Sequence, residues 1–163
     1  MKEPLWKQLR DAAPVDPAYL LEEMEFATAY PIDVYELAKA LDIEVVEVDE
    51  RGDGSLVIHK NHATIHVSNR VAKVRRRFTI AHEIGHLALG HKFEHSIHRD
   101  VSPNRPWRVE REANQYAAQL LMPEKQVRLA FNAFETIDEM AEHFDVSQEA
   151  LVYRLKDLRL ING

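Results

Sequence analysis

Five consecutive residues, His82-Glu83-Ile84-Gly85-His86, combine the residue types and the spacing of a metal-dependent hydrolase. Side chains four positions apart project from the same side of an α-helix, so His82 and His86 can bind one ion together. Glu83 points about 100° away from His82 around the helix, where its carboxylate can reach a water molecule without binding the ion. Zinc hydrolases combine an ion that acidifies water with a carboxylate that takes the proton. The segment therefore predicts one Zn²⁺ ion and Glu83 as the general base.

A catalytic zinc site needs a third protein ligand and leaves the fourth position to water. The downstream candidates are His91, His95, His98, Glu110 and Glu112. Glu110 lies on a face of a predicted helix that is lined by small residues and can press against the motif helix, whereas Glu112 lies on a polar face. We therefore predict Glu110 as the third ligand and Glu112 in solvent. For the three histidines we expect solvated structural roles, with His91 the best of them as a spare ligand or a substrate-side donor.

Two further groups are needed, one to orient a ligand and one to stabilise the oxyanion that forms during hydrolysis. Asn114 lies one helical turn after Glu110, which suits it to orient a ligand. The candidate oxyanion donors are Tyr116, His66 and His91, and the sequence does not rank them.

Composition excludes several other classes of protein. The chain has 163 residues, 45% of them hydrophobic, a formal charge of −6 and no cysteine. Disulfides, thiol nucleophiles and thiolate metal sites are therefore excluded, and an acidic total argues against general binding to nucleic acid. The beginning does not read as a signal peptide, and no apolar run is long enough for a spanning helix. We expect a cytoplasmic protein without a membrane segment.

Local patterns predict a single domain, residues 1–163, of α+β class. Its predicted parts are N-terminal helices in 1–42, with one helix running from Ala18 to Ala29, a small sheet in 43–67, zinc-site helices in 73–121 and a C-terminal helix pair in 136–160. The predicted strands are Ile43–Val48, Ser55–His59 and Ala63–Val67, and the turn residues between them favour an antiparallel meander. Residues 91–107 are polar and contain two prolines, which predicts a loop.

Two blocks, Arg77–Leu87 and Glu110–Pro123, resemble the ImmA/IrrE family of metallopeptidases in their order and separation. The resemblance extends more loosely from about Pro31 to Pro123. It implies a compact zincin, mainly helical around a small three-stranded antiparallel sheet. By position it makes His82, His86 and Glu110 the zinc ligands and Glu83 the general base.

The resemblance also implies a substrate. Members of this family are typically intracellular proteases that cut a helix-turn-helix repressor, so the expected partner is a protein of that type. By analogy with other zincins, we expect the substrate to lie extended along an edge strand, for which Ala63–Val67 is the candidate.

Three alternative functions stay open. The chain can be a non-catalytic, metal-stabilised binding or regulatory module, of antitoxin type or as a repressor partner. It can also hydrolyse a non-peptide substrate, because the same ion and base would serve. The third alternative is a DNA-binding regulator, because the sequence pattern of residues 136–160 is typical of a helix-turn-helix. This segment, however, holds six acidic residues against Arg154, Lys156 and Arg159. Repulsion from phosphates argues against direct DNA binding. Core packing or docking of the substrate protein is the expected role of this pair.

Two features outside the motif have simpler interpretations. The basic triplet Arg75-Arg76-Arg77 opposes the helix dipole, so we expect it to pair with acidic neighbours such as those of residues 42–50. Trp6 and Trp107 are expected as core or edge aromatics.

Overall fold

The computed structural model describes residues 2–91, 97–99 and 107–163. In this part of the chain the elements are α1 (Leu5–Asp11), α2 (Pro17–Glu23), α3 (Val34–Ala40), β1 (Ile43–Val48), β2 (Gly54–His59), β3 (His62–Ser68), α4 (Lys73–Ala88), β4 (Ile97–Arg99), α5 (Trp107–Leu121), α6 (Glu124–Ala133), α7 (Ile137–Phe144) and α8 (Gln148–Asp157). None of these helices has the length and apolar character needed to cross a membrane.

The sheet contains the three predicted strands, which confirms the α+β class, but it is mixed. Its order is β1-β3-β2-β4, with β1 parallel to β3 and the other two pairs antiparallel. The predicted meander is wrong because the connection after β1 crosses to the far side of β3 instead of turning back as a hairpin. Hydrogen bonds from the Ser68 amide to the Asp53 carbonyl (3.0 Å) and from the Asn69 amide to the Val48 carbonyl (2.9 Å) hold this crossing.

The sheet order also corrects the predicted site of strand addition. Ala63–Val67 lies in β3, which is hydrogen-bonded to β1 on one side and to β2 on the other. Its backbone groups are therefore already used, and it cannot accept a substrate strand. Among the described residues the outer strands are β1 and β4. The short β4 falls within the predicted loop 91–107, most of which lies outside the described residues.

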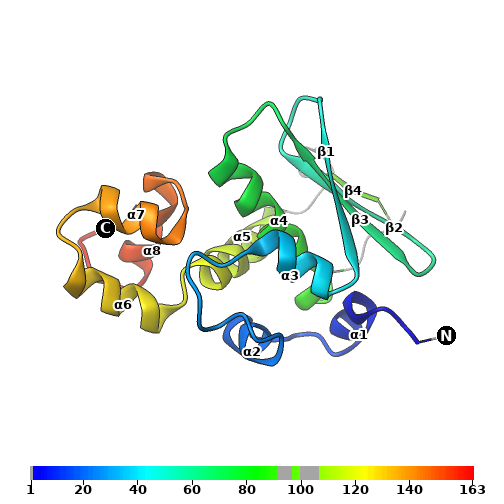
Figure 1. Cartoon of the computed structure of the whole chain (residues 1–163), viewed down its shortest axis with the longest axis horizontal. Coiled ribbons are helices and arrows are strands. Elements are labelled where there is room, and N and C mark those ends of the chain that lie inside the picture. Colours follow the sequence, from blue (N-terminus) through cyan, green and yellow to red (C-terminus); the bar gives the residue numbers. More distant parts are fainter. Residues whose placement is uncertain (1, 92–96, 100–106) are drawn as a thin grey trace.

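Helices α4 and α5 lie between the sheet and the C-terminal helices α6 to α8 (Figure 1). Every residue of α4 from Thr79 to Ala88 is buried, so this helix forms the centre of the core. The side chains of Ile80, Ile84 and Leu87 join Ile65 and Val67 of β3 in one apolar cluster. Because the core is closely packed around α4, this helix has little room to move, and it can hold its side chains in fixed positions.

The ends of the molecule differ from the prediction in two places. The N-terminal helix α2 ends at Glu23 instead of reaching Ala29, and Glu25 just beyond it has a left-handed backbone (φ 64°). Helix α6 was not predicted. Asp33 caps α3 by accepting a hydrogen bond from the Glu36 amide, and Ser147 caps α8 by accepting one from the Ala150 amide. Trp6 is a core residue as expected, whereas Trp107 is 71% exposed.

The basic triplet divides into two surface pairs and one buried residue. Arg75 pairs with Asp53, and the Nε atom of Arg76 lies 3.6 Å from Oε1 of Glu47. The guanidinium of Arg77 is buried and donates to the carbonyls of Ile32 (2.6 Å), Phe144 (3.2 Å) and Asp145 (3.0 Å). Two of these carbonyls close the C-terminus of α7, so Arg77 ties the motif helix to the C-terminal helices.

We expect Arg77→Met to lower the free energy of unfolding by about 3–5 kcal/mol, because the change leaves buried carbonyls without a donor. Arg75→Met is the matched control, and it should cost less than about 1 kcal/mol because the Arg75–Asp53 pair is at the surface. Urea unfolding of both variants measures the difference. Equal losses would show that the buried contacts of Arg77 do not stabilise the fold.

The C-terminal pair α7 and α8 is packed into the core by Phe144, Leu151 and Leu155, all of which are buried. Arg154, one of its three basic residues, is also buried and donates to the carbonyl of Met122 (2.9 Å). Arg154 is therefore not available to contact a phosphate, which weakens the DNA-binding alternative further.

Candidate metal centre

The motif histidines are placed by the last two turns of α4. His82 and His86 are both buried, on consecutive turns of the helix, with their ring centroids 4.6 Å apart. Gly90 ends the helix with a left-handed backbone (φ 73°). The amide of Gly90 bonds to the carbonyl of Leu87 and that of His91 to the carbonyl of His86, which is the Schellman arrangement. This cap sets His91 beside His86.

Helix α5 brings Glu110 to the same place because small residues let it approach α4 closely. A Cβ atom on Gly85 would lie 3.1 Å from the Cβ of Tyr116 and 3.3 Å from the carbonyl oxygen of Ala113. Ala113 and Ala117 are completely buried on the facing side of α5. The predicted small-residue face therefore packs against the motif helix.

The three predicted ligands converge on one point. The Nε2 atoms of His82 and His86 are 3.0 Å apart, the Oε2 atom of Glu110 is 2.9 Å from Nε2 of His82, and its Oε1 atom is 3.4 Å from Nε2 of His86. These three residues form a group that could hold a metal ion. Two ring nitrogens and a carboxylate are a donor set that zinc prefers, and no fourth ligand is needed for a catalytic site.

The spacing of these atoms fits a small ion. Bonds of 2.0–2.1 Å in tetrahedral geometry put neighbouring ligand atoms about 3.3 Å apart. The separations of 3.0, 2.9 and 3.4 Å lie near this value, with the last two ending on different oxygens of the Glu110 carboxylate. The donor set and its spacing therefore fit Zn²⁺.

Asn114 lies where it can orient His82. Its Oδ1 atom is 2.7 Å from Nδ1 of His82. With the amide oxygen as acceptor, the ring carries its proton on Nδ1 and directs the lone pair of Nε2 toward Glu110 and His86. The sequence predicted that Asn114 orients a ligand, and the structure places its amide against His82.

His91 and Glu112 form a second chain of contacts behind His86. The Nδ1 atoms of His86 and His91 are 2.9 Å apart, and Nε2 of His91 is 3.2 Å from Oε1 of Glu112. The predicted solvated role of His91 is wrong, since only 12% of its side chain is exposed. Burial lowers the pKa of the His91 ring, against the opposing effect of Glu112. Glu112 is exposed as expected, but its contact with His91 was not predicted, because helix faces alone do not show where His91 lies after the end of α4.

The charge of Glu110 suits metal binding. Burial raises the pKa of its carboxyl, but the electrostatic contacts with His82 and His86, in the absence of an ion, outweigh burial and lower the pKa to about 2. Glu110 is therefore ionised at neutral pH.

Glu83 is fully buried on α4, next to His82 in the sequence and one turn before His86. Residues three apart on a helix are neighbours, so Glu83 borders His86. Its carboxylate lies outside the group of three candidate ligands.

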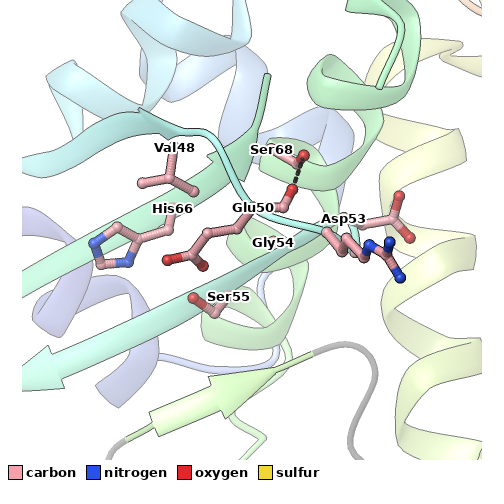
Figure 2. Close-up of a pocket in the computed structure, with 9 residues that line it drawn as sticks. Val48, Glu50, Asp53, Gly54, Ser55, His66 and Ser68 are labelled. Carbon is pink, nitrogen blue, oxygen red and sulfur yellow. Dashed lines mark hydrogen bonds between the residues drawn. The ribbon is translucent and has the colours of Figure 1, made fainter. Parts of the chain in front are cut away.

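The remaining predicted site residues either lie away from the three candidate ligands or form other hydrogen bonds. The hydroxyl of Tyr116 donates to the carbonyl of Val15 (2.9 Å), and burial raises the pKa of this phenol. His66 lines a small hollow with Glu50 and Ser55 (Figure 2). Because side chains alternate along a strand, His66 is on the sheet face opposite the buried Ile65 and Val67. His95 lies outside the described residues, and the side chain of His98 is not described.

Comparison with known proteins gives a family and a fold. Residues 38–156 match the peptidase family described as IrrE N-terminal-like domain. No curated protein matches the chain. A solved structure of a Mycobacterium tuberculosis transcriptional regulator is similar, with a TM-score of 0.63 and 21% identity, over 91% of this chain and 46% of the regulator. At this identity the likeness shows the fold alone, and the chain spans less than half of the regulator's length.

Proposed function

This chain belongs to the peptidase family described as IrrE N-terminal-like domain, and from this membership we propose that it is a zinc-dependent endopeptidase. The observation that carries the proposal is the convergence of His82, His86 and Glu110 within ligand distance of one another. The residues of this site come from α4 and α5, which approach each other closely at Gly85.

His82, His86 and Glu110 would hold the ion, and Glu83 would be the general base. When bound, zinc supplies a positive charge that polarises the scissile carbonyl and lowers the pKa of water. A carboxylate oxygen of Glu83 takes the proton of the attacking water and then delivers it to the nitrogen of the leaving amine. Asn114 keeps the ring of His82 in the orientation that ligation needs.

The sequence predicted Tyr116, His66 or His91 as the donor to the oxyanion, and the contacts of these residues argue against all three. Tyr116 already donates to Val15, His66 faces the opposite side of the sheet, and His91 lies behind His86. None of these three is in place to donate a hydrogen bond to a substrate oxygen, so we assign no residue to this role.

We further propose that the substrate is a helix-turn-helix repressor, cut in the cytoplasm. The resemblance of Arg77–Leu87 and Glu110–Pro123 to the ImmA/IrrE peptidases supports this substrate class. The similarity in fold to a transcriptional regulator is consistent with a role in gene regulation. Cleavage of a repressor would connect a peptidase of this size to transcription without direct DNA binding.

The test is a proteome-wide search for new protein N-termini in cells that express the wild type, compared with cells that express Glu83→Gln. One or a few cuts found only with the wild type would establish a selective endopeptidase and identify its substrate. The absence of any difference, with both proteins folded, zinc-loaded and equally expressed, would contradict constitutive proteolysis.

The same comparison separates the main alternative. A metal-stabilised binding module, of antitoxin type or as a repressor partner, should keep its biological effect in Glu83→Gln because the ligands are unchanged. An endopeptidase should lose the effect. A hydrolase of non-peptide substrates would also lose it, but without new protein N-termini.

A further inference from the structure

Within the described part of the chain, the outer ring nitrogen of His86 contacts another histidine, His91. Nδ1 of His86 is 2.9 Å from Nδ1 of His91, and this contact is on the side of the His86 ring away from Glu110. His91 is therefore placed behind a ligand and does not join the group of His82, His86 and Glu110.

The direction of each hydrogen bond follows from Glu112. An ionised carboxylate only accepts, so Nε2 of His91 must donate to Oε1 of Glu112 across their 3.2 Å contact. A neutral His91 then has its lone pair on Nδ1. That atom can accept the proton of Nδ1 of His86, which leaves the lone pair of His86 on Nε2, facing Glu110.

We propose that His91 and Glu112 are positioning residues that fix the orientation and tautomer of His86 for metal binding. This inference rests on the zinc site of the proposed function. The two motif histidines then have different hydrogen-bond partners. His86 donates to His91, which in turn contacts Glu112, and His82 donates to the Asn114 amide. Such outer partners fix the ligand ring and raise its basicity.

The fold supplies these partners from two different elements. Gly90 closes α4 with a left-handed turn that bonds the His91 amide to the His86 carbonyl (3.0 Å), so the two side chains start from adjacent backbone. Glu112 comes from α5, two residues after Glu110. Its side chain is 48% exposed, whereas that of His91 is 12% exposed, so the chain of contacts runs from the buried ligand to the surface.

The chain itself offers a matched pair of variants. In asparagine, Oδ1 is two bonds from Cβ, as Nδ1 is in histidine, so His91→Asn keeps an acceptor for His86 and removes the contact with Glu112. Asn114 already accepts from His82 in this way. His91→Leu fills similar space but offers no acceptor.

The experiment measures zinc affinity of the metal-free proteins by competition with a chromophoric chelator, and their unfolding by circular dichroism. We expect His91→Leu to weaken zinc binding about 10–100-fold and His91→Asn to bind within about threefold of the wild type. Glu112→Ala should fall between them, and Gln115→Ala, exposed on the same helix, should match the wild type.

Each result has a distinct meaning. Wild-type affinity in His91→Leu would overturn the inference, and so would a loss in His91→Asn as large as that in His91→Leu. If His91→Leu does not fold without metal, the zinc affinities of His91→Asn and Glu112→Ala are compared with that of the wild type. Weaker zinc binding in Glu112→Ala alone supports the inference. Equal affinities of all three proteins overturn it. Failure of the wild type to bind zinc would instead contradict the proposed function, and the inference with it.

Discussion

Replacement of Glu83 by glutamine is expected to lower kcat/KM for cleavage of the substrate by about 10²–10⁴-fold, the usual contribution of a general base. Glutamine has the size of glutamate, so the fully buried position can be filled without a cavity. The amide cannot take a proton from water at neutral pH. Zinc content should be unchanged, because Glu83 is outside the group of three ligands.

The measurement is the rate of cleavage of the identified substrate by zinc-loaded protein, with the metal content determined for each sample. Glu22→Gln, at an exposed position of α2, is the matched control and should cleave at the wild-type rate. A Glu83→Gln protein that retains full zinc and full activity would remove Glu83 from the mechanism. A loss of zinc together with activity would show that Glu83 acts on the site's structure.

The motif helix and its partner could be predicted from sequence because their signals are local. The spacing of His82 and His86 and the apolar stripe of 73–89 both specify a helix, and small residues specify which face of α5 approaches it. The choice of Glu110 over Glu112 followed from these faces alone. The structure places Glu110 with the two histidines and leaves Glu112 exposed.

The strand order and the surroundings of the site could not be predicted, because they depend on contacts between residues far apart in the sequence. Turn residues at 51–54 indicated a reversal, but only the hydrogen bonds of Ser68 and Asn69 show that the chain crosses β3. The contact of His91 with His86 likewise depends on how Gly90 turns the chain. For a similar reason the sequence predicted acidic partners for Arg77, whereas its three carbonyl acceptors come from residues 32, 144 and 145.

Glu110→Ala is expected to weaken zinc binding by about 10²–10³-fold, since the total of about 10–16 kcal/mol typical of structural zinc sites, shared equally among their four ligands, is about 2.5–4 kcal/mol for each ligand. The change removes the only carboxylate of the cluster and leaves two histidines four residues apart. Activity should be lost at zinc concentrations that saturate the wild type. Removal of zinc from the wild type with a chelator should have the same effect, and added Zn²⁺ should reverse it.

Unfolding in urea separates loss of the ion from loss of the fold. Zinc at 100 times its Kd should stabilise the wild type by about 2.7 kcal/mol, because the ion binds the native state alone. At the same concentration Glu110→Ala should gain less than about 1 kcal/mol, since its site is at most about half occupied. Without zinc the variant should be somewhat less stable than the wild type at neutral pH, because the lowered pKa of Glu110 means that its ionised carboxylate stabilises the metal-free fold. The gain from zinc is therefore measured for each protein relative to its own metal-free form. Equal stabilisation of both proteins by zinc would mean that the third ligand is another residue.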